Sequence, residues 1–310
     1  DGTADNGAVY AGRARTRFFP LPAPGDFYTG NREPVEHIGL LRDYYAWHWG
    51  DALFVVIDPY WHSSVVVDNQ VGQPGDAETD IGNGDAGIVA AGTGASVTGN
   101  VVGRNDGAGI SVLSTAKGEV RGNRIGSNTG AGIVTRSADI IIRENRIGVP
   151  ATGDAARANQ VGIDVAEGKA LMKANRIGNA TAEGVKVSPS ATATILANPI
   201  FANGGAGIAA PAPAPAAPAL TLAIRKGTGD TARTWLAVQG PDAPGTLEAF
   251  GNVSCTDPEG KVPLANKTWT GGTKPKVITV RGNASLLGFT ITFTDASLGT
   301  VTQHWTKVSG

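Results

Sequence analysis

Two sets of basic residues recur at a regular spacing in the middle of the chain. The first set directly follows a recurring asparagine, and the second set lies two residues before it. The first set comprises Arg124, Arg146 and Arg176, and the second comprises Arg121, Arg143 and Lys173. Guanidinium groups bind carboxylates and sulfates through paired hydrogen bonds, whereas a lysine ammonium acts as a point charge. If consecutive members lie side by side, they form two basic columns that can bind a row of acidic groups.

Acidic residues in the same stretch give a competing interpretation. Glu119, Asp139, Glu144 and Glu167 lie close to the basic residues in the sequence and can neutralise them. Exposed pairs of opposite charge contribute little free energy and are common on solvated surfaces. The alternatives are therefore a surface that binds a polyanion and an ordinary charged surface whose cations and carboxylates balance.

The basic residues keep step with a repeat that must position them. Gly-Ile or Gly-Val recurs at positions 87, 109, 132, 162, 184 and 207, at intervals of 22 or 23 residues except for one of 30. Asn followed by any residue and then Val or Ile recurs in step, at Asn100, Asn123, Asn145, Asn175 and Asn198. A fixed period of this size, with Gly at the corners, predicts a solenoid of stacked coils. The extra residues of the long repeat, 149–156, predict a protruding loop.

Apolar residues on either side of the asparagines predict the interior of the coils. They lie three residues before each Asn, as at Ile142, and two residues after it, as at Ile147. In a short strand, this alternation turns every second side chain inward. The asparagines themselves can stack into a ladder of amides that satisfies the turn backbone. The six Gly anchors predict about six coils, spaced by roughly 4.8 Å, and this would also be the spacing of the charges in each column.

From about residue 81 to residue 208, the chain resembles the right-handed parallel β-helix of pectate-lyase-like proteins. The Gly-Ile pairs, the apolar columns and the recurring Asn carry this resemblance. It implies a secreted or cell-surface protein. Because the coil spacing is close to the rise of one sugar in an extended polysaccharide, the two basic columns predict an extended acidic polysaccharide or another polyanion as the partner. The resemblance also implies a rival activity, cleavage of that polysaccharide as a lyase or glycoside hydrolase, with a cationic base and carboxylate-bound calcium. The candidates for these catalytic roles are Asp139, Asp164 and Lys173.

The first 70 residues form a different module, which contains all five tyrosines of the chain. The run from Asp43 to Trp61 predicts two strands joined by a turn at Gly50-Asp51. Through this run, residues 13–68 resemble an internal fragment of calcineurin-like metallophosphoesterases. The metal-binding motifs of that family are missing, because Gly30-Asn31 is followed by Arg32 in place of His. A residual metal-dependent phosphoesterase is therefore a third alternative.

This module offers a candidate set of metal ligands and a structural role. Imidazole and carboxylate groups suit zinc or manganese. The candidate ligands are His48, Asp51, Asp58 and His62. The flanking tryptophans favour the other interpretation, in which these histidines are packed aromatic residues. We expect the apolar segment to cap the first coil, because an uncovered coil end exposes strand edges that can associate end to end with another molecule.

The last third of the chain predicts a separate β-domain. An Ala/Pro linker is followed by short runs that alternate apolar and polar residues, as in Leu220-Thr221-Leu222-Ala223-Ile224, with turn residues between them. This pattern is typical of an immunoglobulin-like β-sandwich, and it resembles the small β-domains that follow β-helices in bacterial surface proteins. Trp235, Trp269 and Trp305 either pack in its core or stack on sugars.

The sequence as a whole predicts an all-β protein, a right-handed parallel β-helix with an N-terminal capping segment and a C-terminal immunoglobulin-like β-sandwich. The predicted divisions are residues 1–70, 71–208, 209–218 (the linker) and 219–310. A net charge of −1 gives no indication of a nucleic-acid partner. No apolar run approaches the roughly 18 residues of a membrane span, and the single cysteine excludes an internal disulfide. A chain that starts at Asp1 suggests a processed product.

Overall fold

A computed structural model describes most of the chain after residue 81 and parts of the chain before it. The described residues are 13–14, 16–18, 21–30, 32, 34, 37, 39–40, 42, 44–50, 52–57, 65–72, 82–150, 156–211, 217–227, 231–253, 260–272, 274–282, 286, 288–295 and 301–307. Residues 151–155 of the predicted loop and residues 212–216 of the predicted linker therefore lie outside them. The chain divides into two compact units, residues 1–63 and 64–310. Within the described residues, no helix has the length and apolar character needed to cross a membrane.

The N-terminal unit contains an antiparallel hairpin of β1 (Tyr44–Trp49) and β2 (Ala52–Ile57). Trp49 pairs with Ala52, so the connecting turn falls at the predicted position, and Gly50 has the positive φ that such a turn needs. Aromatic rings pack beside the strands, with Trp47 stacked on Phe54 at 5.0 Å and Tyr28 edge-on to Trp47 at 5.7 Å. These ring contacts supply much of the apolar packing that the described part of this unit shows.

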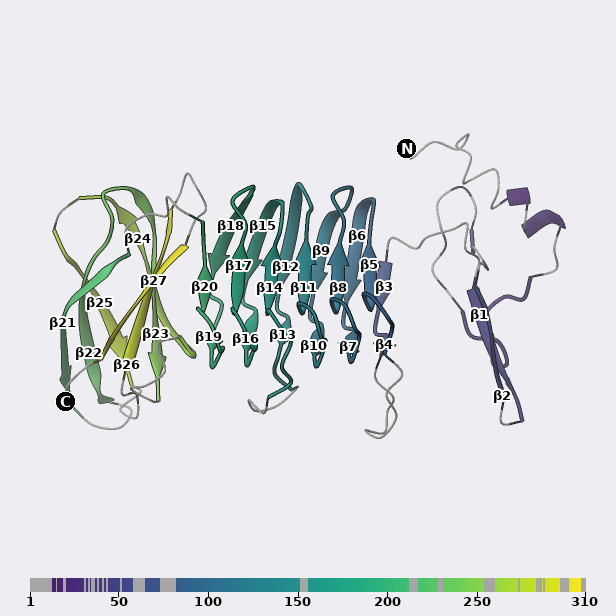
Figure 1. Ribbon diagram of the computed structural model, residues 1–310, viewed down its shortest axis with the longest axis horizontal. Helices are drawn as coiled ribbons and strands as arrows, with labels where there is room; N and C mark the ends of the chain where they lie inside the picture. The colour runs from purple at the N-terminus through teal and green to yellow at the C-terminus, as the bar shows by residue number, and fades with distance from the viewer. Residues whose placement is uncertain are drawn as a thin grey trace. The chain divides into compact units, whose positions relative to one another are not determined.

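The repeat folds into three parallel sheets, each with six strands in register, and consecutive coils add one strand to each sheet (Figure 1). Sheet 1 contains β3 (Val65–Val67), β6 (Thr93–Thr98), β9 (Lys117–Arg121), β12 (Asp139–Arg143), β15 (Gly168–Lys173) and β18 (Ala191–Leu196). Sheet 2 contains β4 (Gln70–Val71), β7 (Val101–Gly103), β10 (Arg124–Gly126), β13 (Arg146–Ile147), β16 (Arg176–Gly178) and β19 (Ile200–Phe201). Sheet 3 contains β5 (Ile88–Ala90), β8 (Ile110–Val112), β11 (Ile133–Thr135), β14 (Ile163–Val165), β17 (Val185–Val187) and β20 (Ile208–Ala209). This is the parallel β-solenoid that the repeat predicts.

The first coil starts earlier than the sequence division at residue 71 suggested. Val66 of β3 pairs with Val97, and Val71 of β4 pairs with Val102, both in parallel. The early start has a physical reason, because Asn69 occupies the corner position of this coil and its Nδ2 donates to Asn100 Oδ1 at 3.0 Å. Residues 65–71 therefore belong to the solenoid, and the first module ends before them.

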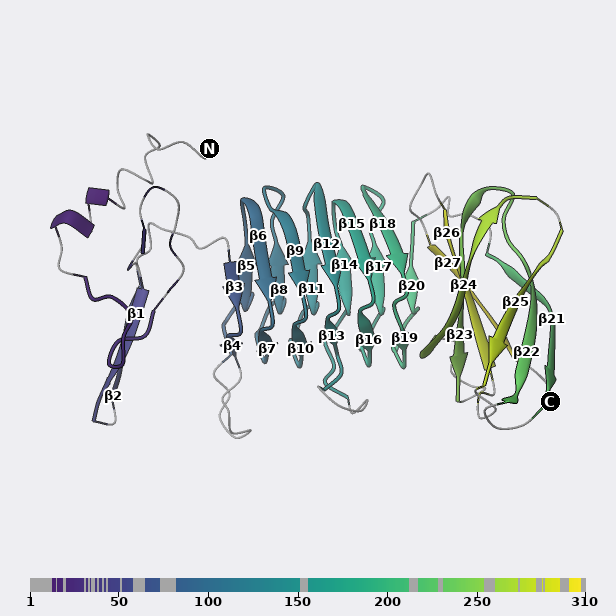
Figure 2. The same cartoon turned by 180° about the vertical axis from the view of Figure 1, so that it is seen from behind.

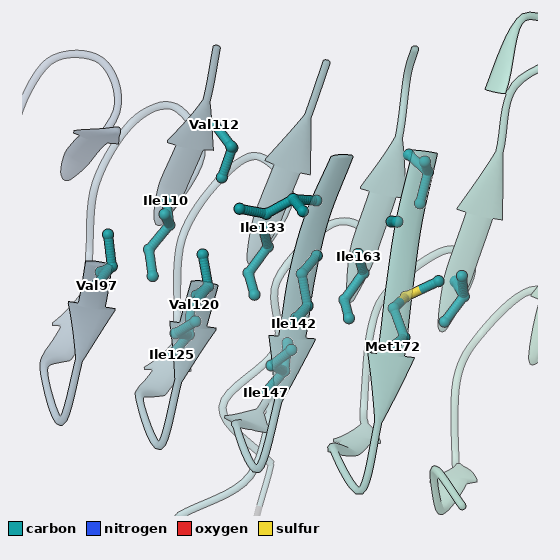
Figure 3. Close-up of a cluster of buried hydrophobic side chains, with 14 of the residues drawn as sticks. Val97, Ile110, Val112, Val120, Ile125, Ile133, Ile142, Ile147, Ile163 and Met172 are labelled. Carbon is teal, nitrogen blue, oxygen red and sulfur yellow. The ribbon is translucent and has the colours of Figure 1, made fainter. Parts of the chain in front are cut away.

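The interior of the solenoid is a set of stacked aliphatic columns. In sheet 3 the strands bury their first and third residues and turn the second outward, as the Gly-Ile pattern predicts. Ile110, Ile133 and Ile163 are fully buried at successive levels of one column, and Figure 3 shows them pointing into the same core as Val120, Ile142 and Met172 of sheet 1. Cβ groups cannot be added at the Gly corners, since one at Gly109 would lie 2.7 Å from the carbonyl oxygen of Gly132.

The C-terminal region forms two antiparallel sheets around one core, and Figure 2 shows them at the end of the solenoid that carries β19 and β20. The three-stranded sheet contains β21 (Ala219–Lys226), β22 (Arg233–Gln239) and β25 (Lys276–Arg281). The four-stranded sheet contains β24 (Val262–Thr270), β23 (Pro244–Asn252), β26 (Gly288–Asp295) and β27 (Val301–Lys307). Trp269 is fully buried in the shared core, so it packs rather than binds a sugar. The immunoglobulin-like connection of these strands stays a prediction.

These sheets cover the last coil and replace the partners that a further coil would supply. In the preceding coil, the Ala174 N–H donates to the carbonyl of Leu196 at 3.2 Å, whereas the Ala197 N–H donates to both carboxylate oxygens of Glu248 at 2.8 and 3.0 Å. The Ile200 N–H donates to the carbonyl of Gly260 at 2.8 Å. Burial raises the pKa of Glu248 to about 6, although the Ala197 N–H opposes the shift. The open edge of the solenoid is thus satisfied by the C-terminal region at this end.

Candidate functional site: a basic corner of the solenoid

Each coil turns from sheet 1 into sheet 2 through a corner of two residues. The first corner residue has a left-handed backbone, with φ of +64° at Gly122, +59° at Glu144 and +55° at Ala174. This conformation is easy for glycine and costly for other residues. The second corner residue is the recurring Asn. The cation before the corner ends a strand of sheet 1, and the cation after it begins a strand of sheet 2.

A ladder of buried asparagine amides fixes the corner. Both the backbone N–H and Nδ2 of Asn123 donate to Oδ1 of Asn145 at 2.9 Å, and Nδ2 also donates to the carbonyl of Val97. Asn145 repeats this arrangement toward Asn175. The ladder runs through Asn69, Asn100, Asn123, Asn145, Asn175 and Asn198. The five asparagines that the sequence singled out are therefore brought together in one stack, which holds the flanking cations at a fixed height.

A second ladder, which the sequence prediction did not include, lies at the corner between sheets 2 and 3. Its amides are those of Asn83, Asn105, Asn128 and Asn159, with the same bonding of N–H or Nδ2 to the next Oδ1. The ladder is interrupted at Ala180, and Nδ2 of the buried Asn159 has no hydrogen-bond partner among the described residues. Each of these asparagines lies three or four residues before a Gly-Ile pair, so they form a second periodic series in the sequence.

Both basic columns are in register across three coils. Arg146 pairs with Arg124 on one side and with Arg176 on the other. Arg143 pairs with Arg121 and with Lys173 in the same way. We call these six residues the basic corner, with a sheet 1 side (Arg121, Arg143 and Lys173) and a sheet 2 side (Arg124, Arg146 and Arg176). Their backbone spacing is that of neighbouring strands, about 4.8 Å.

On the sheet 1 side, two glutamates link adjacent coils to the arginines. Arg121 Nε contacts Glu144 at 2.8 Å, and Arg143 contacts Glu119 at 2.9 Å and Glu144 at 3.1 Å. The hydrogen bond to Glu119 raises the pKa of the Arg143 guanidinium, and the hydrogen bond from Arg121 lowers the pKa of the Glu144 carboxyl. Lys173 is exposed and makes no ion pair with a described residue. Glu119 and Glu144 therefore neutralise most of the positive charge on the sheet 1 side. This agrees with the interpretation that acidic neighbours balance the basic residues.

On the sheet 2 side, the three arginines have different surroundings. Arg124 is exposed and its guanidinium has no hydrogen bond or ion pair with any described residue. Arg146 donates from Nε to the carbonyl of Pro150, in the loop that the long repeat adds. The Arg176 guanidinium lies over the ring of Phe201 at 4.5 Å. These two contacts orient the guanidinium groups, and the contacts themselves bring no negative charge with them.

The three catalytic candidates do not form one site. Asp139 begins β12 and pairs with Lys117, whereas Lys173 ends β15 at the level of Arg143. The two levels are four residues apart along the strand direction, or about 13 Å. Asp164 lies on the outer face of sheet 3 and pairs with Lys186. Burial raises the pKa of Asp164, opposed by Lys186 and Arg136, and its Oδ1 has no hydrogen-bond partner among the described residues.

Of the proposed metal ligands of the first module, the structure describes His48. His48 is exposed in β1, and Asp51, Asp58 and His62 lie outside the described residues. Across the part of the chain that is described, no group of three or more His, Cys, Asp or Glu side chains could hold a metal ion.

Comparison with known proteins identifies the repeat. Residues 78–211 match the family model of the right handed beta helix region. No curated protein matches the chain significantly. The chain is similar to the crystal structure of the enzymatically active domain of Bacteriophage CBA120 tailspike protein 2, with 6% identity, a TM-score of 0.31, and coverage of 79% of this chain and 57% of that chain. None of these matches supports the phosphoesterase resemblance of residues 13–68. The parallel solenoid is therefore shown by the strand pairing, and its right hand rests on the family model.

Proposed function

We propose that the protein binds an extended acidic polysaccharide along the basic corner, with the polymer parallel to the solenoid axis. The observation that carries the proposal is the register of Arg124, Arg146 and Arg176, three cations at one strand position. Like charges side by side on adjacent strands destabilise a sheet. A polyanion with an acidic group on each sugar would offset that repulsion, because its repeat is close to the spacing of the coils.

The charge balance of the corner also supports this proposal. Among the described residues, Arg121 and Arg143 pair with Glu119 and Glu144, whereas the exposed Arg124 and Lys173 form no ion pair, which leaves an excess of positive charge. The chain as a whole has a net charge of −1, so this excess is local. Local positive charge attracts polyanions and orients them before contact. A location outside the cell or at its surface belongs to the same proposal, since extended acidic polysaccharides occur there.

The proposal is tested by electrophoresis through gels that contain pectate, alginate, a heparin-like sulfated polymer or a neutral polysaccharide. We expect the acidic gels to retard the protein, the neutral gel to leave its mobility unchanged, and Arg124→Ala to reduce the retardation about threefold or more. Lys117→Ala removes one exposed cation at the far end of β9 and serves as the charge-matched control. Equal loss in both variants would assign the retardation to net charge and contradict the proposal.

Cleavage of an acidic polysaccharide on the outer face of sheet 3, away from the basic corner, is a second candidate, favoured by the state of Asp164. A carboxyl group with a raised pKa can donate a proton to a leaving-group oxygen, as general acids of glycoside hydrolysis do. Glu183 is a nearby carboxylate that also raises the pKa of Asp164. The same gels, stained for polymer after electrophoresis with or without calcium, test this candidate. Clearing that disappears in Asp164→Asn would support it, and clearing that persists in this variant would exclude Asp164 as the acid.

The proposal also includes the C-terminal region. We propose that its sheets form an immunoglobulin-like sandwich, which caps the solenoid while the basic corner binds the polysaccharide. The hydrogen bonds of Ala197 and Ile200 to this region support the capping role. End-to-end association would then be limited to the other end of the solenoid, and sedimentation at increasing protein concentration measures it.

A further inference from the structure

The outer face of the three-stranded C-terminal sheet has an unusual composition. An antiparallel sheet that packs one face in a core normally presents polar residues on the other. Here Leu222, Ile224 and Val277 are 54%, 50% and 49% exposed. Isolated apolar residues on a surface need no explanation, but these three belong to one contiguous face.

The strand register arranges this face in three rows. Leu222 pairs with Ala237 and Ala237 with Val277, which forms an aliphatic row. The next row contains Ile224, Trp235 and Thr279, with the partly exposed indole on the central strand. The alternation of burial along β22 and β25 shows that these side chains point away from the core, whereas Leu236, Ile278 and their neighbours point into it.

The third row consists of three cations. Lys226 pairs with Arg233, and Arg233 pairs with Arg281, so one positive charge lies on each strand. All three side chains are exposed, and none forms a hydrogen bond or an ion pair with another described residue. Three like charges in register are unfavourable for the sheet itself. The row adjoins the Trp235 row on the same face, two residues along each strand, or about 7 Å away.

The size of the face limits the occupant. Three strands and three rows span roughly 10 Å by 14 Å. A stable protein interface needs about 800 Å² on each partner, several times more than this face offers. One or two sugar rings have the matching size. A sugar ring places its C–H face on an aromatic side chain, and a uronic acid adds a carboxylate that a guanidinium binds bidentately.

We propose that this face is a second carbohydrate site, which binds one or two uronic acid residues of a glycan. The ring lies on Trp235 beside Ile224, and its carboxylate contacts Arg233 and Arg281. The site uses none of the residues of the basic corner, so an experiment can contradict either proposal without affecting the other. It would give the chain two separate contacts with an acidic glycan, and linked contacts of this kind raise the overall affinity.

The test is a calorimetric titration of the full chain with a uronic acid tetrasaccharide and with a neutral tetrasaccharide of the same length. An Arg124→Ala, Arg146→Ala background weakens binding at the basic corner, and every variant of the second site is compared within that background. We expect Trp235→Ala to lower the affinity for both ligands about five- to tenfold. The double variant Arg233→Gln, Arg281→Gln should lower the affinity for the acidic ligand about tenfold to that of the neutral one, and leave the neutral ligand unaffected. Lys274→Gln, which changes an exposed cation of the same region that belongs to none of the three rows, is the control.

Several outcomes would overturn the proposal. Unchanged uronate affinity in the Arg233→Gln, Arg281→Gln variant would do so even if Trp235→Ala failed to fold, because both arginines are exposed. Binding of the chain to vesicles that contain phosphatidylserine, with no binding of the tetrasaccharide, would assign the face to a membrane surface. A concentration-dependent dimer that dissociates in Trp235→Ala would assign it to a second copy of the chain.

Discussion

The two sides of the basic corner have the same number of cations and the same register, but they differ in their partners. The sheet 1 side is tied by Glu119 and Glu144, which join coil to coil through Arg121 and Arg143. On the sheet 2 side, Arg124 has no such partner among the described residues, and Arg176 rests on an aromatic ring. The comparison shows that a repeat fixes where a charge lies, whereas residues that do not repeat decide whether the charge is available.

The largest effect on this comparison comes from the ladder that holds both sides in register. Asn145→Ala removes an acceptor for Asn123 and a donor to Asn175 and Val120, and we expect it to lower the free energy of unfolding by about 1–3 kcal/mol. Denaturant unfolding measures this. Asn159→Ala is the matched control at the other corner, and its loss should be smaller because its Nδ2 already lacks a described partner. A larger loss for Asn159→Ala would contradict the account of the ladders.

The free energy of unfolding should depend on pH through Glu248, whereas the charges of the two sides should not change over the same pH range. The folded pKa of Glu248 is about 6, above the usual 4.5, so its protonated form favours the folded state. Its contribution is complete below pH 4.5 and is lost as the pH rises through 6, at a cost of about 2 kcal/mol. Glu248→Gln should abolish this decrease in unfolding free energy.

The same pH range should leave the difference between the two sides unchanged. The lowered pKa keeps Glu144 ionised above pH 4.5, so its ion pairs with Arg121 and Arg143 persist. Glu167→Gln, a change at a carboxylate away from the C-terminal sheets, is the control for the stability measurement. If Glu248→Gln retained the pH dependence of the wild type, another group would be responsible and the capping contact would lose its support.

A smaller effect is expected from a variant that removes the carboxylates of the sheet 1 side and so makes the two sides alike in their partners. The double variant Glu119→Gln, Glu144→Gln releases Arg121 and Arg143 from their carboxylates. We expect it to bind a sulfated polysaccharide about two- to fivefold more tightly, with little change in the midpoint of thermal unfolding, because exposed ion pairs contribute little to stability. Affinity electrophoresis gives the first quantity and a thermal melt the second. Unchanged retardation would mean that these glutamates do not mask the sheet 1 side.

The parts of this account that depend on periodicity could be predicted from the sequence. The spacing of Asn123, Asn145 and Asn175 predicts that the flanking cations lie in register, because each coil repeats the same corner. The second ladder is equally periodic, so the spacing of Asn105, Asn128 and Asn159 predicts a second stack of amides in the same way. The motif Asn69-Gln70-Val71 has the same form and would have placed the first coil correctly.

Contacts between residues far apart in the chain were beyond such a prediction. Glu248 meets Ala197 across 51 residues, and nothing in the local sequence of either shows that one completes the hydrogen bonds of the other. Asp139 and Lys173 are separated because they lie at opposite ends of neighbouring strands. The period of the repeat does not predict how long those strands are. The outer face of the C-terminal sheet became visible only through the pairing of β21, β22 and β25, which aligns Lys226 with Arg233 and Arg281.

The most direct measurement compares two double variants with the same change in net charge, Arg124→Ala, Arg146→Ala and Arg121→Ala, Arg143→Ala. Each is titrated calorimetrically with one sulfated polysaccharide at one salt concentration. The account predicts that the first variant loses about tenfold or more in affinity, about 1.4 kcal/mol, and that the second loses less than about threefold. Equal losses, or a larger loss in the second variant, would contradict the claim that the polyanion binds on the sheet 2 side of the basic corner.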